Sequence, residues 1–413
     1  MTFLVTANAV GIFFKPLLDE FHWDRATLSL VVSISMLVFA VVSPFLGRLI
    51  DHFGPRIILL GSVASQILSS VVSGLANGIV CIYIGRLLYE LKPIHSTQVL
   101  INRWFVRKRG RALGILSTGI PLGTLVLSPI SQYLILKWSW RTTYFFWAGV
   151  TALVGLPLIL WIRNKPEDKG LLTDGELPAG ELATIAVSRP MFDAVKLKAQ
   201  PDTGNTLVEA AKSGSFWLLS ATQLICGISC GLLMTHTVIF TTDLGYSPII
   251  GASFLSVHGG VSLLGVLVTG LMSDRFSRNK VLSLTHFIRS LSFLILVITI
   301  LTVGDFLPLL YLAMVFFGFG WFTTAPLAAG LVADLFGNLR MGTILGIILA
   351  SHMVGMAIGT YAGGITYQLT GSYLNIFIIT GALELLACFF ALIIKSKAGV
   401  VKAPKLETGL DFH

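Results

Sequence analysis

The chain has 413 residues, of which 54% are hydrophobic and 12% are charged, and it carries a net charge of +9. A soluble globular protein has roughly 25% charged residues, so this composition excludes a water-soluble fold. The positive charge could suit nucleic acid, but no soluble domain accompanies the basic cluster at residues 103–111. We therefore interpret that cluster as an anchor beside anionic headgroups, with the lipid bilayer as partner and no nucleic acid.

Apolar runs of about 20 residues recur along the whole chain, which is the length that a helix needs to cross a bilayer core of about 30 Å. Irregular backbone would leave polar groups unpaired in lipid, and the alternating pattern of a barrel strand does not occur, so helices are expected. Twelve spans are predicted near residues 1–18, 27–46, 56–75, 78–102, 111–136, 142–162, 216–241, 249–272, 281–301, 308–333, 341–366 and 374–395.

A polar stretch without a sustained apolar period separates six spans from six. The predicted organisation is a first bundle at residues 1–162, a cytoplasmic linker at 163–215, a second bundle at 216–395 and a cytoplasmic tail at 396–413. Only 14 residues precede Lys15, so we expect the first helix to be truncated and Met1 to be an internal start.

Lysine and arginine are distributed unevenly between the alternate loops. The side that carries the termini and the linker collects 22 of them, and the opposite side holds four. Cytoplasmic loops are the ones enriched in lysine and arginine, so both termini are predicted to be cytoplasmic in a cell (inner or plasma) membrane. We expect the protein to function as a monomer.

One short polar loop occurs twice, 223 residues apart, and each copy lies between two long apolar stretches. The chain therefore looks like one membrane unit used twice, and two such halves can rock to expose a central cavity to one side at a time. Charges in these loops could bridge helices in one gating state, or could simply be solvated by headgroups. The candidate gating residues are Gly47, Asp51, Gly54 and Arg56 in the first copy and Gly270, Asp274, Arg275 and Arg278 in the second.

The first loop reads Gly-x-x-x-Asp-x-x-Gly-x-Arg, and with its degenerate copy it resembles the signature of the major facilitator superfamily. Within that superfamily, residues 11–23, 103–114 and 242–248 look like the monocarboxylate porter and oxalate:formate antiporter group. The resemblance implies an all-α polytopic membrane protein with 12 transmembrane helices in two pseudo-symmetric six-helix bundles. It also implies a secondary active transporter of small organic anions, working by alternating access with a coupling proton or by exchange.

Span four carries Arg86, Tyr89, Glu90 and Lys92 inside a segment that should cross the bilayer. Ionisable groups at that depth are costly and normally face a cavity or one another. Arg86 and Glu90 are four residues apart, so they share a helix face and can form an ion pair. Two interpretations stay open: these groups line the transport path, or they form a mutually neutralising structural cluster. The resemblance adds that the superfamily often places an arginine in span four.

Two positions depart from the organic-acid carriers. Val266 stands where they usually have an arginine that holds the carboxylate, and Asn8 stands where animal monocarboxylate carriers have a lysine. Another cation such as Arg86, Lys92 or Arg289 must then supply the charge, or the substrate is not a simple carboxylate. The alternatives are a carrier of neutral or amphipathic metabolites and, given the short first span, a truncated non-transporting homologue or membrane sensor.

His236 and Trp321 are further candidates for the substrate cavity. The resemblance places a histidine at this point of span seven, and histidine can carry a coupling proton near neutral pH. A neutral, hydrogen-bonded core histidine is the alternative. Trp321, in the middle of span ten, could close against a substrate or be ordinary packing.

Arg289 in span nine and Glu384 in span twelve lie at depths that differ by only about 4 to 5 Å, so they could pair. The superfamily uses these spans as outer supporting helices, which favours a structural ion pair over a substrate role. All four cysteines fall inside apolar runs and give no disulfide or metal-site signal. No phosphate-binding loop or paired nucleophile and base occurs, so we expect no metal, no cofactor and no enzyme activity.

Overall fold

The computed structural model describes residues 10–91, 94–105, 109–164, 166–170, 206–302, 307–337 and 341–394. Asn8 and Lys92 lie outside the described residues, as do the side chains of Asp51 and Asp274. Most of the predicted linker and the whole predicted tail lie outside them too. The limits proposed for these segments therefore stay predictions.

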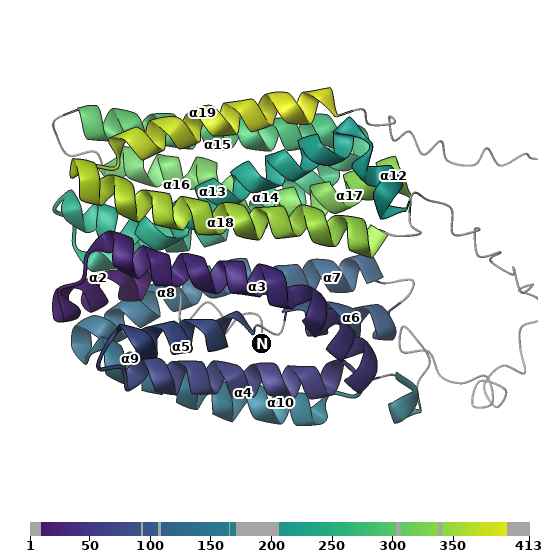
Figure 1. Cartoon of the computed structure of the whole chain (residues 1–413), viewed down its shortest axis with the longest axis horizontal. Coiled ribbons are helices and arrows are strands. Elements are labelled where there is room, and N and C mark those ends of the chain that lie inside the picture. Colours follow the sequence, from purple (N-terminus) through teal and green to yellow (C-terminus); the bar gives the residue numbers. More distant parts are fainter. Residues whose placement is uncertain are drawn as a thin grey trace, which may run out of the picture.

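The described helices form two bundles, which we call the N-half and the C-half. In Figure 1 the N-half is the lower bundle and the C-half is the upper one. The N-half contains α2 (Val10–Phe21), α3 (Arg25–Phe53), α4 (Pro55–Gly74), α5 (Ile79–Glu90), α6 (Ile94–Trp104), α7 (Arg109–Ser117), α8 (Gly119–Lys137), α9 (Trp140–Val150), η2 (Thr151–Gly155), α10 (Leu156–Trp161) and η3 (Pro166–Lys169). The C-half contains α12 (Leu207–Ala211), α13 (Gly214–Asp243), α14 (Pro248–Arg275), α15 (Arg278–Leu301), α16 (Leu307–Trp321), α17 (Thr324–Phe336), α18 (Met341–Thr370) and α19 (Leu374–Ile393).

Within the described part of the chain, ten helical stretches are long and apolar enough to cross a membrane. They coincide with the second, third and fifth to twelfth predicted spans. Helix α2 and the α5–α6 pair occupy the places of the first and fourth spans. The expectation of an all-α polytopic membrane protein is thus confirmed.

Several predicted spans are interrupted rather than continuous. Span ten is divided between α16 and α17, and Trp321, expected in the middle of one helix, is the last residue of α16. The Thr323 hydroxyl donates to the Gly320 carbonyl at 3.0 Å, and Pro326 has no N–H to give to the preceding turn, so the helical ladder is broken here. The fourth span is broken after α5, just before Pro93 in the sequence.

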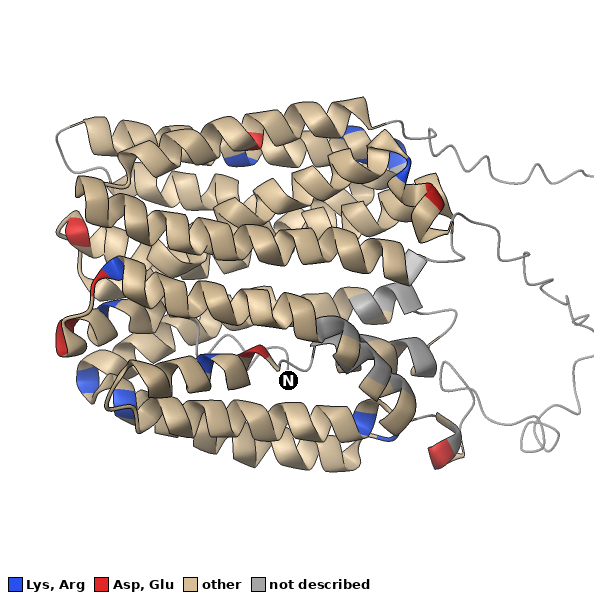
Figure 2. Cartoon of the chain, viewed as in Figure 1, with Lys and Arg blue, Asp and Glu red and all other residues tan. Residues whose placement is uncertain are grey.

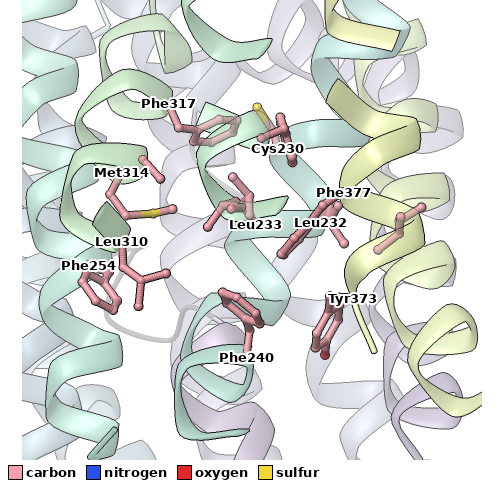
Figure 3. Close-up of a cluster of buried hydrophobic side chains, with 14 of the residues drawn as sticks. Cys230, Leu232, Leu233, Phe240, Phe254, Leu310, Met314, Phe317, Tyr373 and Phe377 are labelled. Carbon is pink, nitrogen blue, oxygen red and sulfur yellow. The ribbon is translucent and has the colours of Figure 1, made fainter. Parts of the chain in front are cut away.

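The core of the C-half surrounds α13. Figure 3 shows aromatic and aliphatic side chains of α13, α14, α16 and α19 converging on one cluster. Helix α18 lies against α13 with almost no space between the two backbones, because glycines face the contact from both helices. An added Cβ at Gly231 would lie 2.1 Å from the Met356 carbonyl oxygen, and one at Gly359 would lie 1.9 Å from that of Ile228. The two helices can pack this closely only through such small residues.

The N-half and the C-half meet at one end of the molecule, where α2 and α13 end and α3 and α14 begin. We call it the Arg25 end; it lies on the left in Figure 1. Helix α3 contacts α18 there, and the Ser33 hydroxyl donates to the Ala357 carbonyl at 2.8 Å. Helix α8 also contacts α14, where Gly259 faces Pro121 and Leu125 near the start of α8. The first three turns of α3 are largely buried, whereas Val41, Phe45 and Leu49 farther along are 67%, 53% and 40% exposed. The opposite end, where α3 ends and α4 begins, we call the Arg56 end.

Candidate functional site

Most charged residues of the described part of the chain lie at the two ends of the helices, where a polar medium can solvate them (Figure 2). Two pairs lie deep inside the bundles instead, one in each half. Charges in a low-dielectric interior are expensive unless they are paired, so these positions are the places to look for function or for strong structural constraint.

The N-half pair lies on α5. Arg86 donates from Nη2 to Glu90 Oε1 at 2.9 Å, and its guanidinium carbon lies 4.3 Å from the centre of the Tyr89 ring. The side chains of Arg86 and Glu90 are 9% and 3% exposed. The Nε–H of Arg86 is buried and has no hydrogen-bond partner among the described residues. The structure thus brings together three of the four candidates in span four, and it leaves one Arg86 donor available.

The C-half pair has a more elaborate environment. Arg289 on α15 lies 3.0 Å from Glu384 on α19, and His286 Nδ1 lies 2.7 Å from the other oxygen of the same carboxylate. From α13, the Ser229 hydroxyl contacts both Arg289 and Glu384, and the Cys226 carbonyl accepts from Arg289 Nη2 at 3.0 Å. The predicted contact between Arg289 and Glu384 is present, and its structural role remains a prediction.

His286, Ser229 and Cys226 were not predicted to contact this pair. One signal was available: Arg289 and His286 are three residues apart on one helix, and Cys226 and Ser229 are three apart on another. Such spacing places both members of each pair on a common face.

A third ion pair links the two halves at the Arg25 end. The Arg25 guanidinium donates to both oxygens of Asp243, at 2.6 and 2.7 Å, and to the Tyr373 hydroxyl at 3.1 Å. Its carbon lies 3.5 Å from the centre of the Tyr367 ring, which covers it. From the sequence alone, Arg25 is recognisable only as a loop charge, because its partner lies 218 residues away and the pairing depends on how the halves dock.

His236 extends this inter-half contact inward. It is 1% exposed, and its Nδ1 lies 3.0 Å from the Tyr373 hydroxyl. Its Nε2 lies 2.9 Å from the Thr360 carbonyl and 3.4 Å from the Ser29 hydroxyl of the N-half. The candidate is therefore a buried, hydrogen-bonded histidine at the junction of the halves.

Trp321 lies inside the C-half, with its ring 4.0 Å from that of His258. It belongs to the side chains packed against the cluster of Figure 3. Val266, which stands where the organic-acid carriers usually have an arginine, is half-buried on α14 and supplies no charge there. The structure does not place Trp321 with the span-four group or with His236.

The two polar loops lie at the Arg56 end. Arg56 donates to the Leu160 carbonyl at 3.1 Å, and its backbone N–H donates to Asn164 at 2.9 Å. Gly54 has φ +81°, a conformation that favours glycine, and Asn164 lies close to where a side chain would be. In the second loop, Arg278 pairs with Asp334 of the same half at 2.5 Å, while Arg275 is exposed. Gly47 belongs to α3, and Gly270 to α14 with open space around it.

Glu20, near the end of α2, belongs to a separate contact at the Arg25 end. The hydrogen bond from Arg141 lowers the pKa of Glu20, and Trp140 donates to the same carboxylate at 2.5 Å. This contact fastens the end of α2 to the start of α9 and lies within the N-half.

Two bundles of membrane-crossing helices, joined at one end by an ion pair and burying another ion pair each, define a multi-pass helical membrane protein. The model of the Major Facilitator Superfamily matches residues 1–360 of the chain. The chain belongs to this superfamily.

Individual relatives cover most of the chain. An uncharacterized MFS-type transporter, YcxA of Bacillus subtilis, is 29% identical over 378 residues, which are 89% of this chain and 86% of the relative. Monocarboxylate transporter 13 of Rattus norvegicus is 23% identical over 382 residues, 91% of this chain and 81% of the relative. Monocarboxylate transporter 4 of Gallus gallus is 21% identical over 384 residues, 91% of this chain and 76% of the relative.

Proposed function

We propose that this transporter is a secondary carrier of small, monocarboxylate-like organic anions, and that Arg86 binds the carboxylate. The Arg86–Glu90 geometry is the observation that carries the proposal. A buried guanidinium binds carboxylates strongly, and Arg86 keeps one buried donor without a partner among the described residues. The names of two similar proteins, both monocarboxylate transporters, support the same substrate class.

Glu90 gives this site a means of proton coupling. Arg86 and Glu90 together are neutral, so a second carboxylate arriving at Arg86 would leave one excess negative charge in the interior, at a high cost. A proton on Glu90 cancels that charge. Arg86 can then exchange Glu90 for the substrate, and one proton accompanies each anion.

Alternating access follows from the contact between the halves. The inter-half ion pair joins the halves at the Arg25 end, and α3 packs on α18 and α8 on α14 farther inside. In the proposed orientation both termini are cytoplasmic and the Arg25 end faces the exterior, as the uneven distribution of lysine and arginine favours. Breaking this contact while the Arg56 end closes would expose a central passage to the other side.

Uptake of labelled two- to four-carbon organic acids into proteoliposomes tests the proposal. We expect saturable uptake that an acidic exterior stimulates, and a loss of at least tenfold in Arg86→Ala. Arg141→Gln is a matched control, because Arg141 lies at the Arg25 end and pairs with a partly exposed Glu20. It should keep most of the uptake. Unchanged saturable uptake in Arg86→Ala would contradict the assignment of Arg86.

A carrier of neutral or amphipathic metabolites is the second candidate, and a specific observation favours it. The buried arginines Arg86 and Arg289 and the half-buried Arg25 each contact a carboxylate. With Val266 in α14, no unpaired intramembrane cation is seen in that part of the chain. Saturable uptake of uncharged compounds, together with no uptake of organic acids at any pH, would establish this candidate instead.

A further inference from the structure

Five groups at the Arg25 end form one continuous hydrogen-bonded chain across the junction of the halves. Asp243, Tyr373, His236 and Thr360 belong to the C-half, and Arg25 comes from the N-half. The links measure 2.6 Å from Arg25 to Asp243, 3.1 Å from Arg25 to Tyr373, 3.0 Å from Tyr373 to His236 and 2.9 Å from His236 to the Thr360 carbonyl.

The partners fix the direction of every bond. A carbonyl can only accept, so His236 Nε2 carries the hydrogen that Thr360 accepts. In the neutral ring Nδ1 is then an acceptor, and it receives the Tyr373 O–H. The tyrosine oxygen in turn accepts the N–H of Arg25. While His236 is neutral, both of its ring nitrogens and the Tyr373 hydroxyl therefore have hydrogen-bond partners.

A proton on Nδ1 is incompatible with this arrangement. The Tyr373 hydroxyl would have to accept from both Arg25 and His236, and its own hydrogen would lose its acceptor in a buried site. The imidazolium would also share a single bridging oxygen with the Arg25 guanidinium. Two like charges this close in a buried site repel strongly.

The groups around His236 offer no compensation for that charge. From α3 it meets Ser29 and, through Tyr373, Arg25; from α18 it meets the Thr360 carbonyl, with Tyr367 beyond Tyr373. From α2 the Phe14 ring faces it at 5.2 Å. On α13 itself, the carboxylate of Asp243 lies seven residues farther along the helix, about 10 Å of helix rise, and Arg25 already engages both of its oxygens.

We propose that His236 is a proton-binding site that controls the Arg25 end: a neutral ring keeps the halves together, and a proton on Nδ1 releases them. When the halves part, Arg25 leaves with α3, while His236, Tyr373 and Asp243 stay together in the C-half. The imidazolium then loses its repulsion from Arg25, and the carboxylate of Asp243 on the same helix is freed. Protonation therefore favours the state that is open at the Arg25 end. The proposal rests on the alternating movement proposed above, but not on the identity of the substrate.

Distances between spin labels across the Arg25 end test this directly in nanodiscs of the full chain. Asn77→Cys in the N-half and Ser247→Cys in the C-half are exposed positions for the labels. Cys81 and Cys388 are replaced by serine, and the buried Cys226 and Cys230 are kept. Lowering the pH from 8 to 5 should move the population from a short to a long distance. One proton can change the ratio of the two states by at most about tenfold per pH unit.

Two variants separate the proton site from general effects of acid. His236→Gln retains a donor and an acceptor but cannot bind a proton, so its short distance should persist at pH 5. His258→Gln is the matched control, because His258 is equally buried in the C-half but has no part in the chain, and it should respond like the wild type. A response of His236→Gln equal to that of the wild type would overturn the proposal.

Arg25→Ala distinguishes failure of this proposal from failure of the proposed function. It removes the inter-half ion pair at every pH, so the long distance should dominate throughout. A distance that lengthens in Arg25→Ala but never with pH in the wild type would refute the role of His236 alone. A distance that no variant and no pH changes would refute the movement of the halves itself.

Discussion

Each half of the molecule buries an arginine beside a glutamate, yet the two pairs are built differently. Arg86 and Glu90 lie on a single helix of the N-half, four residues apart. Arg289 and Glu384 come from α15 and α19 of the C-half, and α13 adds hydrogen bonds to both.

The number of helices that a pair connects determines what the pair can do. An arginine and glutamate on one helix can separate by a change of side-chain rotamers, without moving a backbone. A pair that joins three helices cannot exchange a partner unless those helices shift. We therefore assign exchange with a substrate to the N-half pair and stabilisation of the bundle to the C-half pair.

The largest expected effect comes from breaking the C-half pair. Arg289→Met leaves the fully buried Glu384 without its cation, which should cost roughly 3 to 5 kcal/mol of unfolding free energy. Thermal unfolding in detergent, followed by tryptophan fluorescence, measures this. Arg86→Met also leaves a buried carboxylate, Glu90, but it should lose less, because Arg289 additionally donates to α13 and Arg86 pairs only within its own helix among the contacts described above.

The double variant Arg289→Met with Glu384→Leu is the control for the C-half pair. Replacing both charges by apolar groups removes the uncompensated carboxylate, so most of the lost stability should return. If Arg289→Met alone unfolded like the wild type, the assignment of the pair to bundle stability would be wrong.

The next effect concerns the packing that holds α13 in the C-half. Gly359→Ala places a Cβ 1.9 Å from the backbone carbonyl oxygen of Ile228, so α13 and α18 must move apart. We expect a loss of about 1 to 3 kcal/mol in the same unfolding measurement. Gly61→Ala on α4 is the matched control, since nothing lies within 4 Å of its added Cβ, and it should stay within about 0.5 kcal/mol of the wild type. Equal stability of the two variants would show that the close contact of α13 and α18 is not needed.

Much of this architecture could be predicted from the sequence, because span length and the duplicated loop depend on local patterns. The positions of ten described membrane-crossing stretches follow directly from apolar runs. The contact of Arg86 with Glu90 was also predictable, since four residues of one helix fix the distance.

The contacts that depend on docking were not predictable in the same way. Arg25 pairs with Asp243 only when the two bundles are packed together, and the local sequence around either residue does not specify that packing. Arg278 similarly pairs with Asp334 of α17, 56 residues away, and that contact depends on how two helices pack together. The break at Trp321 depends on a hydroxyl that competes for a backbone carbonyl, which apolar periodicity does not reveal.

The third prediction compares the two buried pairs in uptake measurements. Glu90→Gln removes the charge that competes for Arg86, so the apparent affinity for an organic acid at pH 7.5 should rise by about tenfold, or about 1.4 kcal/mol. The dependence of uptake on pH should weaken at the same time. Glu384→Gln, the matched change in the C-half, should not raise the apparent affinity for the organic acid. A gain in Glu384→Gln but not in Glu90→Gln would exchange the roles assigned to the two pairs.

The smallest effect belongs to a pair that is exposed rather than buried. Glu20 and Arg141 have side chains that are 41% and 33% exposed, so solvent screening limits their contribution to under about 1 kcal/mol. Because Arg141 lowers the pKa of Glu20, the folded state favours the carboxylate; this stability is present above the unfolded pKa and is lost as the pH falls through the folded one. The unfolding midpoint of Glu20→Gln should therefore lie slightly below that of the wild type at pH 7, and the difference should shrink as the pH falls towards 3. Asp19→Asn, at an exposed pair within the same helix, is the control for a general loss of charge. A difference that persists undiminished at pH 3 would mean that Glu20 acts through the shape of its contact with Trp140 and not through its charge.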